Sequence, residues 1–332
     1  MSPPAASSPA PSSASAGRRH GARLIELVQA RGAIVVLAVA ILTAGASFPN
    51  FLRLGNLEDI VTAASFLGLV AIGQTFVIIM GGFDLAVGSM VSVGTVLAAY
   101  AVPYGWGAAL LVPTVAGVLV GLVDGLLIAR ARMAPFIVTL AALLALKGAA
   151  VALAGESMVI AGAPAFTAIA NGHLLGVNNL IVILLAAFAL AALVLNRMPY
   201  GAAVFAVGGN EEAARMLGLR VERIKVATYC VSGGLAGLSG ALLAARLSSG
   251  LSAAGNGYEL QSIAAAVIGG VLLTGGVGTL AGALAGVLLL GLINNVINQI
   301  GTLSAAYQGL ASGAFLLLAV IIQSGLTRRR RM

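Results

Sequence analysis

Ten apolar segments, most of them long enough to cross a lipid bilayer, divide this 332-residue chain. A bilayer-spanning helix needs about 20 mostly apolar residues, because the hydrocarbon core is about 30 Å thick. Charged residues make up only 8% of the chain, against about a quarter in a soluble domain, which excludes a soluble fold. We therefore predict an all-α polytopic membrane protein with about ten transmembrane helices. Their approximate limits are 31–48, 60–80, 84–102, 107–129, 135–154, 178–195, 226–247, 258–273, 279–300 and 305–325.

The positions of Lys and Arg predict the orientation of these spans, since basic residues concentrate in cytoplasmic loops. With the N-terminus inside, 15 of the 18 basic residues fall in cytoplasmic segments. We therefore expect both termini in the cytoplasm. The net charge of +8 is spread over these segments, so nucleic acid is not an expected partner.

The same reasoning divides the chain into three regions. Residues 1–30 begin with a Pro/Ser/Ala tract that lacks the apolar content needed to fold, so we expect a disordered cytoplasmic tail. Residues 31–325 form the transmembrane domain, whose longest cytoplasmic connection is 196–225. Residues 326–332 form a basic cytoplasmic tail.

Two stretches inside the predicted membrane region carry glycine pairs that disfavour a continuous helix. They are GGFDLAVGS at 81–89 and GGVLLTGGVGT at 269–279. Irregular backbone at this depth is tolerated only where it is buried in protein or lines a wet cavity. We expect broken or re-entrant helices there, and the glycines concerned are Gly81, Gly82, Gly88, Gly269, Gly270, Gly275 and Gly276.

Polar side chains within the spans are candidates for the wall of a route through the bundle, because lipid does not satisfy polar groups. The candidates are Gln74, Asp84 and Asn295. Two interpretations of Asp84 remain open. It is either a functional carboxylate or the cap of the helix that begins just after it at the cytoplasmic end of the hairpin.

Two further features lie within the spans. The run Gly121–Gly125, containing Asp124, resembles 291–295 in an oppositely oriented span. An inverted repeat, in which spans two to five mirror seven to ten, is one explanation, and chance similarity is the other. Asp124 and Lys147 lie in adjacent antiparallel spans, where we expect them to neutralise each other.

The connection 196–225 contains GGNEEAARMLGLRVERIK, which predicts a short helix. Asn210 suits its N-cap, two glutamates follow at the positive end of the helix dipole, and Gly218 suits its C-terminal stop. Exposed apolar residues favour docking on a partner, whereas an ordinary solvated helix is the alternative. The predicted docking residues are Asn210, Glu211, Glu212, Ala213, Ala214, Arg215, Met216, Leu217 and Gly218.

Motifs that the chain lacks also limit its function. No phosphate-binding loop G-x-x-x-x-G-K-[ST] occurs, so ATP hydrolysis would require another polypeptide. We find no catalytic constellation, no metal-ligand spacing and a single cysteine, Cys230. We therefore expect no catalytic residues, no bound metal and no cofactor.

Four motifs in order resemble the permeases of ribose- and xylose-type bacterial ABC importers, in the branched-chain amino acid/monosaccharide permease superfamily. The resemblance covers roughly 30–325. The motifs are GGFDLAVGS (81–89), GLVDGLLIA with PFIVTL (121–140), YGAAVFAVGGNEEAARMLGL (200–219) and GYELQSIAAAVIGGVLLTGGVGTLAGALAG (257–286).

This resemblance implies a multi-pass protein of the bacterial inner membrane that forms the path of a monosaccharide such as ribose. It implies that the helix ending at Gly218 is the coupling helix that docks on a separate ATPase, which uses ATP and Mg. An extracytoplasmic sugar-binding protein and a second permease copy, in a homodimer, are the other implied partners. The chain departs from the family at Asp124, Lys147 and Gln261, where the family usually has Asn, Arg and Asp.

Three alternatives remain open on sequence grounds. An ion-coupled secondary transporter would use intramembrane acids such as Asp84 and Asp124. A membrane-embedded enzyme lacks a reacting constellation. A permease of the same superfamily could carry a non-sugar solute, because a separate binding protein largely sets substrate identity in such systems.

Overall fold

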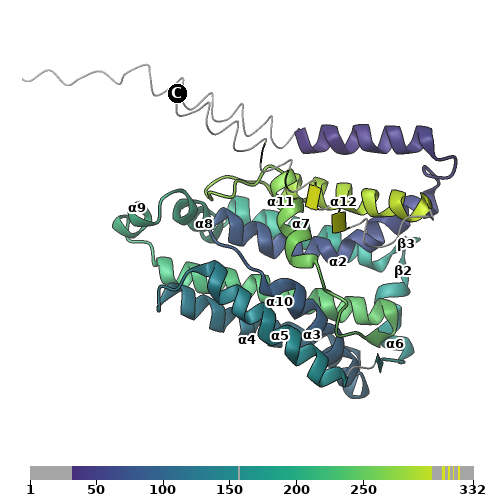
Figure 1. The fold of residues 1–332 in the computed structure, drawn as a ribbon, viewed down its shortest axis with the longest axis horizontal. Helices are drawn as coiled ribbons and strands as arrows, with labels where there is room; N and C mark the ends of the chain where they lie inside the picture. Colours follow the sequence, from purple (N-terminus) through teal and green to yellow (C-terminus); the bar gives the residue numbers. More distant parts are fainter. Residues whose placement is uncertain are drawn as a thin grey trace, which may run out of the picture.

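A computed structural model describes residues 32–155 and 158–300, together with positions 309, 310, 313, 314, 317 and 321. The predicted N-terminal tail, the basic C-terminal tail and most of the tenth predicted span lie outside these residues. The described part is nearly all α-helical (Figure 1). This confirms the prediction of an all-α protein.

The helices and strands of the described residues follow one another as a chain of long helices joined by short connections. The helices are Gly32–Ser47, α2 (Leu54–Ile79), α3 (Ala86–Ala101), η1 (Val102–Tyr104), α4 (Trp106–Ala129), α5 (Pro135–Ala154), α6 (Pro164–Asn171), α7 (Asn179–Arg197), α8 (Pro199–Gly209), α9 (Glu211–Met216), α10 (Val221–Leu247), α11 (Tyr258–Ile268) and α12 (Leu280–Ile300). The strands are β1 (Val159–Ile160), β2 (His173–Leu174), β3 (Val177–Asn178) and β4 (Ser249–Gly250). The antiparallel pairs β1–β4 and β2–β3 are the sheets of the described part.

Seven of the described helices are long and apolar enough to cross a membrane, namely α2, α3 extended through η1, α4, α5, α7, α10 and α12. Gly32–Ser47 and α11 are shorter apolar helices. Each of the first nine predicted spans therefore coincides with a helix. The chain is a multi-pass membrane protein.

Helix ends differ from the predicted limits for identifiable reasons. α2 begins at Leu54 and α10 at Val221, several residues before the predicted starts at 60 and 226. Charged residues lie between these helix starts and the predicted ones, Glu58 and Asp59 in α2 and Glu222, Arg223 and Lys225 in α10. A helix can continue beyond the hydrocarbon core into water. α11 ends at Ile268 rather than 273, because the Gly269–Gly270 pair follows it.

Several elements were not predicted. The connection between α5 and α7 contains α6 and three short strands, and 196–225 contains α8 before α9. These helices have few residues, so their apolar periodicity is a weak signal.

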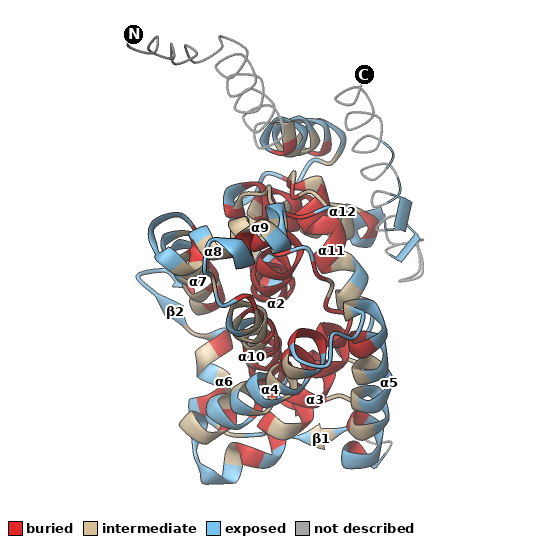
Figure 2. Cartoon of the chain, turned by 90° about the vertical axis from the view of Figure 1, so that its left-hand side faces the viewer, coloured by how far each residue is buried: buried red, intermediate tan, exposed pale blue. Residues whose placement is uncertain are grey.

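Helices α2, α3 and α10 form the inside of the bundle, whereas α4, α5 and α7 lie outside (Figure 2). In an apolar 18-residue stretch of α2, 94% of the residues are buried, whereas in the corresponding stretch of α5 only 17% are buried. Exposed apolar residues on the outer helices suit contact with lipid. Many polar side chains of α2, α3 and α10, such as Gln74, Ser92 and Ser232, are buried inside the protein.

Candidate functional site

The two predicted helix breaks contact each other. One is the segment 80–85 between α2 and α3, and the other is the segment 269–279 between α11 and α12. The amide of Gly276 donates a hydrogen bond to the carbonyl oxygen of Ile79 at 2.8 Å, which joins the two breaks directly. Sequence reasoning predicted both breaks but not their contact, because it forms between residues almost 200 positions apart.

Four glycines in these breaks adopt positive φ angles, and the break geometry depends on them. The values are 88° at Gly81, 89° at Gly270, 82° at Gly275 and 75° at Gly276. Side chains other than glycine rarely adopt this conformation. Gly82 and Gly269 lie in or next to the breaks, whereas Gly88 lies in the first turn of α3.

Gly88 allows a close contact instead of a break. A Cβ atom built on Gly88 would overlap a carboxylate oxygen of Glu259, which belongs to the first turn of α11. Gly88 thus permits the start of α11 to pack against the start of α3. The prediction that Gly88 breaks a helix was wrong.

Asp84 lies near the end of the first break, two residues before α3 begins, and is only 3% exposed. Its Oδ1 accepts a hydrogen bond from the amide of Ala86 at 3.0 Å, and its Oδ2 accepts one from the hydroxyl of Ser232 at 2.7 Å. The first bond is the local contact that the capping interpretation predicts. The second ties the break to α10, so Asp84 also links two helices far apart in sequence.

Ser232 was missed by sequence reasoning. A serine within a glycine-rich helix usually bonds to its own helix, so its sequence carries no sign of a distant carboxylate partner. The neighbouring Tyr229 is fully buried, and its hydroxyl donates to the carbonyl of Phe83 at 3.2 Å. α10 therefore supports the first break through two side chains.

Gln74 lies close to this cluster. The preceding residue, Gly73, packs on Ser232. A Cβ atom built on Gly73 would lie only 2.7 Å from the Cα atom of Ser232. Gln74 is fully buried, and neither polar atom of its amide group has a hydrogen-bond partner within the described part of the chain. Leaving a buried polar group unpaired costs about 1 to 3 kcal/mol. The Gln74 amide is therefore suited to a hydrogen-bond partner from outside the described residues.

Asn295 does not join Gln74 and Asp84. Its amide nitrogen donates to Asn56 Oδ1 at 2.9 Å, near the start of α2. Asn56 and Gln74 lie on the same helix, and their separation along it is about 27 Å at 1.5 Å per residue. The three candidate residues therefore do not form one cluster.

Asp124 and Lys147 do not form the expected pair. Asp124 is 4% exposed, whereas Lys147 lies on the exposed outer side of α5. No ion pair joins them in the part of the chain that the structure describes. Asp124 lies near the cytoplasmic end predicted for α4 and Lys147 nearer the middle of α5, so their depths differ.

Helix α9 forms as predicted between Asn210 and Gly218. The Asn210 side chain accepts a hydrogen bond from the amide of Ala213 at 3.0 Å, which confirms the N-cap. Gly218 has a φ of 82°, and the amides of Gly218 and Leu219 donate to Arg215 and Ala214 at 2.9 and 3.1 Å. This bonding pattern is a Schellman motif, which ends helices at a left-handed glycine.

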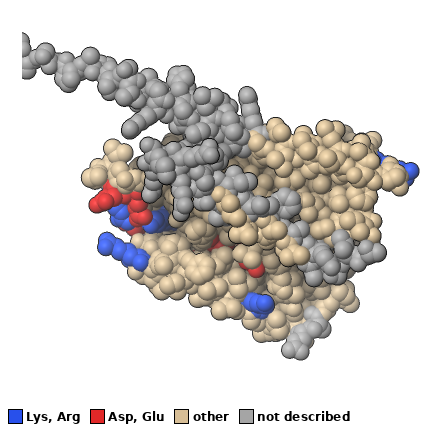
Figure 3. All heavy atoms as spheres, turned by 45° about the horizontal axis from the view of Figure 1, so that its top comes forward, with Lys and Arg blue, Asp and Glu red and all other residues tan. Residues whose placement is uncertain are grey.

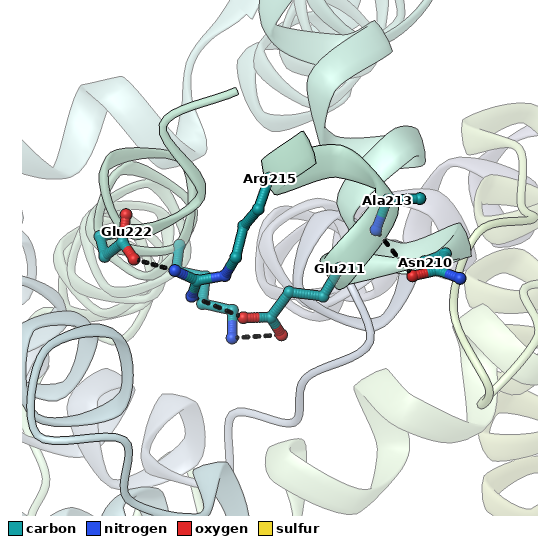
Figure 4. A network of polar contacts seen from close by, with 6 residues as sticks. Asn210, Glu211, Ala213, Arg215 and Glu222 are labelled. Carbon is teal, nitrogen blue, oxygen red and sulfur yellow. Dashed lines mark hydrogen bonds and ion pairs between the residues drawn. The ribbon is translucent and has the colours of Figure 1, made fainter. Parts of the chain in front are cut away.

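Charged side chains gather around α9 at one end of the molecule (Figure 3). Glu211 pairs with Lys225 at 2.7 Å and with Arg215 at 3.0 Å, and Arg215 also pairs with Glu222 (Figure 4). Partial burial by itself would raise the pKa of the Glu211 carboxyl. The hydrogen bonds from Lys225 and Arg215 outweigh burial and lower this pKa below its usual value, so Glu211 stays ionised at neutral pH.

A cavity of about 510 Å³ lies between α9 and the connection from α4 to α5. Its surface combines charged groups of α9 with apolar atoms. Met216 and Leu217, at the end of α9, are each 79% exposed. Exposed apolar side chains beside a polar cavity are typical of a surface that another protein covers. The residues lining the cavity are Ile128, Ala129, Arg132, Met133, Pro135, Glu211, Glu212, Arg215 and Lys225.

The described residues contain no group of three or more His, Cys, Asp or Glu side chains that could hold a metal ion. Several polar groups of the bundle instead form small hydrogen-bonded sets, such as Asp84 with Ser232, and Asn56 with Asn295 and Gln299. Their arrangement suits hydrogen bonding to a polar solute or to one another.

Comparison with known proteins identifies the family. The family model described as "Branched-chain amino acid transport system / permease component" matches residues 56–320. The chain belongs to this permease family. The resemblance predicted from four motifs is therefore confirmed, and the chain is a transport component rather than an enzyme.

Several curated relatives are similar to this permease over most of their length. The ribose import permease protein RbsC of Bacillus subtilis is 36% identical over 87% of this chain and 89% of its own. The L-arabinose ABC transporter permease protein AraH of Azospirillum brasilense is 34% identical over 99% and 97%. The inner membrane ABC transporter permease protein YjfF of Escherichia coli is 36% identical over 84% and 87%. No solved structure matches the chain.

Proposed function

We propose that this permease is the transmembrane subunit of an ATP-binding cassette importer for a monosaccharide such as ribose or arabinose, in the bacterial inner membrane. The observation that carries this proposal is its 34% and 36% identity to permeases named for L-arabinose and ribose. A relative named as an inner membrane protein supports the location. A separate ATPase uses ATP and Mg, and an extracytoplasmic binding protein delivers the sugar to a permease homodimer.

Transport assays test this proposal directly. The permease is co-expressed with a candidate partner ATPase and sugar-binding protein, and uptake of radiolabelled D-ribose, L-arabinose and L-leucine is measured in vesicles. We expect a pentose to be taken up, and we expect this uptake to require ATP. Uptake driven by a proton gradient without the ATPase would favour an ion-coupled transporter, and uptake of leucine alone would favour a non-sugar permease.

The topology that we propose has ten spans, both termini in the cytoplasm and α9 on the cytoplasmic side. The distribution of basic residues supports it. In a variant carrying Cys230→Ser, a cysteine at Asn171 is expected to react with an impermeant maleimide from outside intact cells. Cysteines at Arg215 and Arg329 should react only after the membrane is opened. The reverse accessibility at any of these positions would contradict the ten-span model.

We further propose that the solute route passes the first helix break, where Gln74 and Asp84 lie. Their burial and the unpaired amide of Gln74 support this assignment, since sugar hydroxyl groups both donate and accept hydrogen bonds. Asn295 belongs to a separate polar cluster with Asn56 and Gln299. We propose that this cluster lines the same route nearer one membrane surface.

Substitutions in the route should change transport more than folding. Gln74→Leu removes the buried amide, and Asp84→Asn keeps the shape of the side chain but removes the carboxylate that accepts from Ser232. We expect both variants to lower the rate of sugar uptake at normal membrane abundance, measured in the vesicle assay. Ser239→Ala is a matched control, because the Ser239 hydroxyl donates to the backbone carbonyl oxygen of Phe66 in α2 at 2.8 Å rather than to a side chain of the break. Unchanged uptake in both test variants would leave Asp84 with the capping role alone.

A further inference from the structure

Helix α9 is attached to the bundle at both of its ends, and the two attachments lead to the same place. Its N-terminal end continues from α8, which reaches the two helix breaks. Its C-terminal end turns into α10, which carries the Ser232 partner of Asp84. Such a double attachment makes the position of α9 and the geometry of the breaks depend on each other.

The N-terminal attachment is a backbone contact at Gly208, the second-last residue of α8. A Cβ atom built on Gly208 would overlap the carbonyl oxygen of Ile79, and would lie 2.8 Å from the amide nitrogen of Gly276. Gly275, in turn, approaches the backbone of Gly208 and Gly81, with its Cβ position 2.9 Å and 3.0 Å from them. The end of α8 therefore touches both breaks with no side chain between them.

Helix α8 is also held against the helices that flank this contact. The ring of Tyr200 stacks on Phe76 of α2 with 6.2 Å between ring centroids. The Tyr200 hydroxyl shares a 2.8 Å hydrogen bond with Thr228 of α10. α8 is thus packed between α2 and α10. This packing limits how far the C-terminal end of α8, at Gly208, can slide.

The C-terminal attachment is ionic. Lys225 lies in the second turn of α10 and is the least exposed member of the network, with 17% of its side chain accessible. Two ion pairs join α9 to α10 across the four-residue turn 217–220, namely Glu211 with Lys225 and Arg215 with Glu222 (Figure 4). Ser232 follows Val221 by 11 residues, or about 16 Å of helix.

We infer that Gly208 and the Glu211–Lys225 pair are positioning elements that make α9 move as one body with the two helix breaks. This inference rests on the proposed function, together with the expectation that the ATPase docks on α9 and displaces it. Displacement at α9 passes through Gly208 to Ile79 and Gly276, and through α10 to Ser232 and Asp84. Packed contacts between rigid elements transmit displacement, whereas flexible linkers absorb it.

Alanine substitutions at the adjacent residues Gly208 and Gly209 distinguish the positioning role of Gly208 from an effect of helix propensity. Gly208→Ala forces α8 away from Ile79, whereas a Cβ atom on Gly209 has no atom within 4 Å. Both changes add the same methyl group to the same helix. The reconstituted complex of permease, ATPase and binding protein is assayed for pentose uptake and for ATP hydrolysis. We expect Gly208→Ala to lower the uptake per ATP hydrolysed by about 2- to 30-fold, the range for residues along coupling networks, and Gly209→Ala to leave it unchanged.

The ionic attachment between Glu211 and Lys225 allows a second, independent test, which applies even if Gly208→Ala fails to fold. Lys225→Gln removes the pair with Glu211, whereas Lys225→Arg retains it. We expect Lys225→Gln to lower the uptake per ATP with the ATPase still bound, and Lys225→Arg to restore it. The double variant Glu211→Gln/Lys225→Gln should be no worse than the more impaired single variant, because each single change already breaks the Glu211–Lys225 pair.

The outcomes distinguish this inference from the proposed function. If wild-type permease neither binds the ATPase nor transports a pentose, the proposed function fails. If the wild type does both, and folded Gly208→Ala and Lys225→Gln keep its ratio of uptake to hydrolysis, the positioning role is overturned. A loss that Lys225→Arg does not restore also overturns it.

Discussion

Replacement of Gly218 by valine is expected to weaken docking of the ATPase strongly while the permease still inserts in the membrane. Gly218 has a φ of 82°, and a non-glycine residue in the left-handed region costs about 1 to 3 kcal/mol, with β-branched residues at the upper end. This cost corresponds to about a 5- to 150-fold fall in the population of the native turn. Helix α9 has only six residues, so it cannot keep its position without its terminal turn.

Co-purification of the ATPase and sugar-dependent ATP hydrolysis are the measurements for Gly218→Val. The matched control is Gly218→Asn, because asparagine tolerates the left-handed conformation much better than valine. A Cβ atom at this position meets no other atom within 4 Å, so the two variants differ in backbone strain rather than in clashes. Wild-type docking and hydrolysis in Gly218→Val would show that this turn is not part of the coupling surface.

Replacement of Gly117 by leucine is expected to prevent the bundle from folding. α4 and α10 pack backbone to backbone, and a Cβ atom on Gly117 would overlap the carbonyl oxygen of Gly233. Gly121 and Gly237 make the same kind of contact with Tyr229 and Pro113. Close packing of small residues is a main source of helix association in lipid, so separating the two helices removes much of what holds them together.

The expected destabilisation by Gly117→Leu is at least the roughly 1 to 3 kcal/mol typical of overpacked cores, because backbone atoms rather than side chains must move. Detergent-solubilised protein is examined by size-exclusion chromatography and by its temperature of aggregation. Gly107→Leu is the control in the same helix, since a Cβ atom on Gly107 has no atom within 4 Å. Equal amounts of monodisperse protein from both variants would mean that the α4–α10 contact is not required.

The main features of the fold could be predicted from local patterns along the chain. Apolar segments located nine helices, and the Gly81–Gly82 and Gly269–Gly270 pairs located both breaks, because hydrophobic length and helix propensity act over neighbouring residues. The capping asparagine and terminal glycine of α9 were likewise visible, since a helix cap involves side chains within a few residues. The four motifs sufficed to recognise the permease family.

The candidate site was only partly predictable, because its decisive contacts join distant segments. Sequence reasoning placed Asp84 correctly at a break but did not find Ser232 as its partner. It also grouped Asn295 with Gln74, although these residues lie at different levels of the bundle. Polarity within a span identifies a residue that needs a partner, but it does not identify which helix supplies it.

The sequence by itself determined that this protein is a helical membrane permease with two broken helices and a short capped helix in a loop. Only the tertiary structure decided that the breaks touch, that Gly208 contacts both, and that Asp84 is bonded to α10. It also decided that Asp124 and Lys147 remain apart, contrary to expectation. The physical reason is that helix formation depends on neighbouring residues, whereas helix packing depends on which small residues let two backbones approach, and that requires the arrangement of the whole bundle.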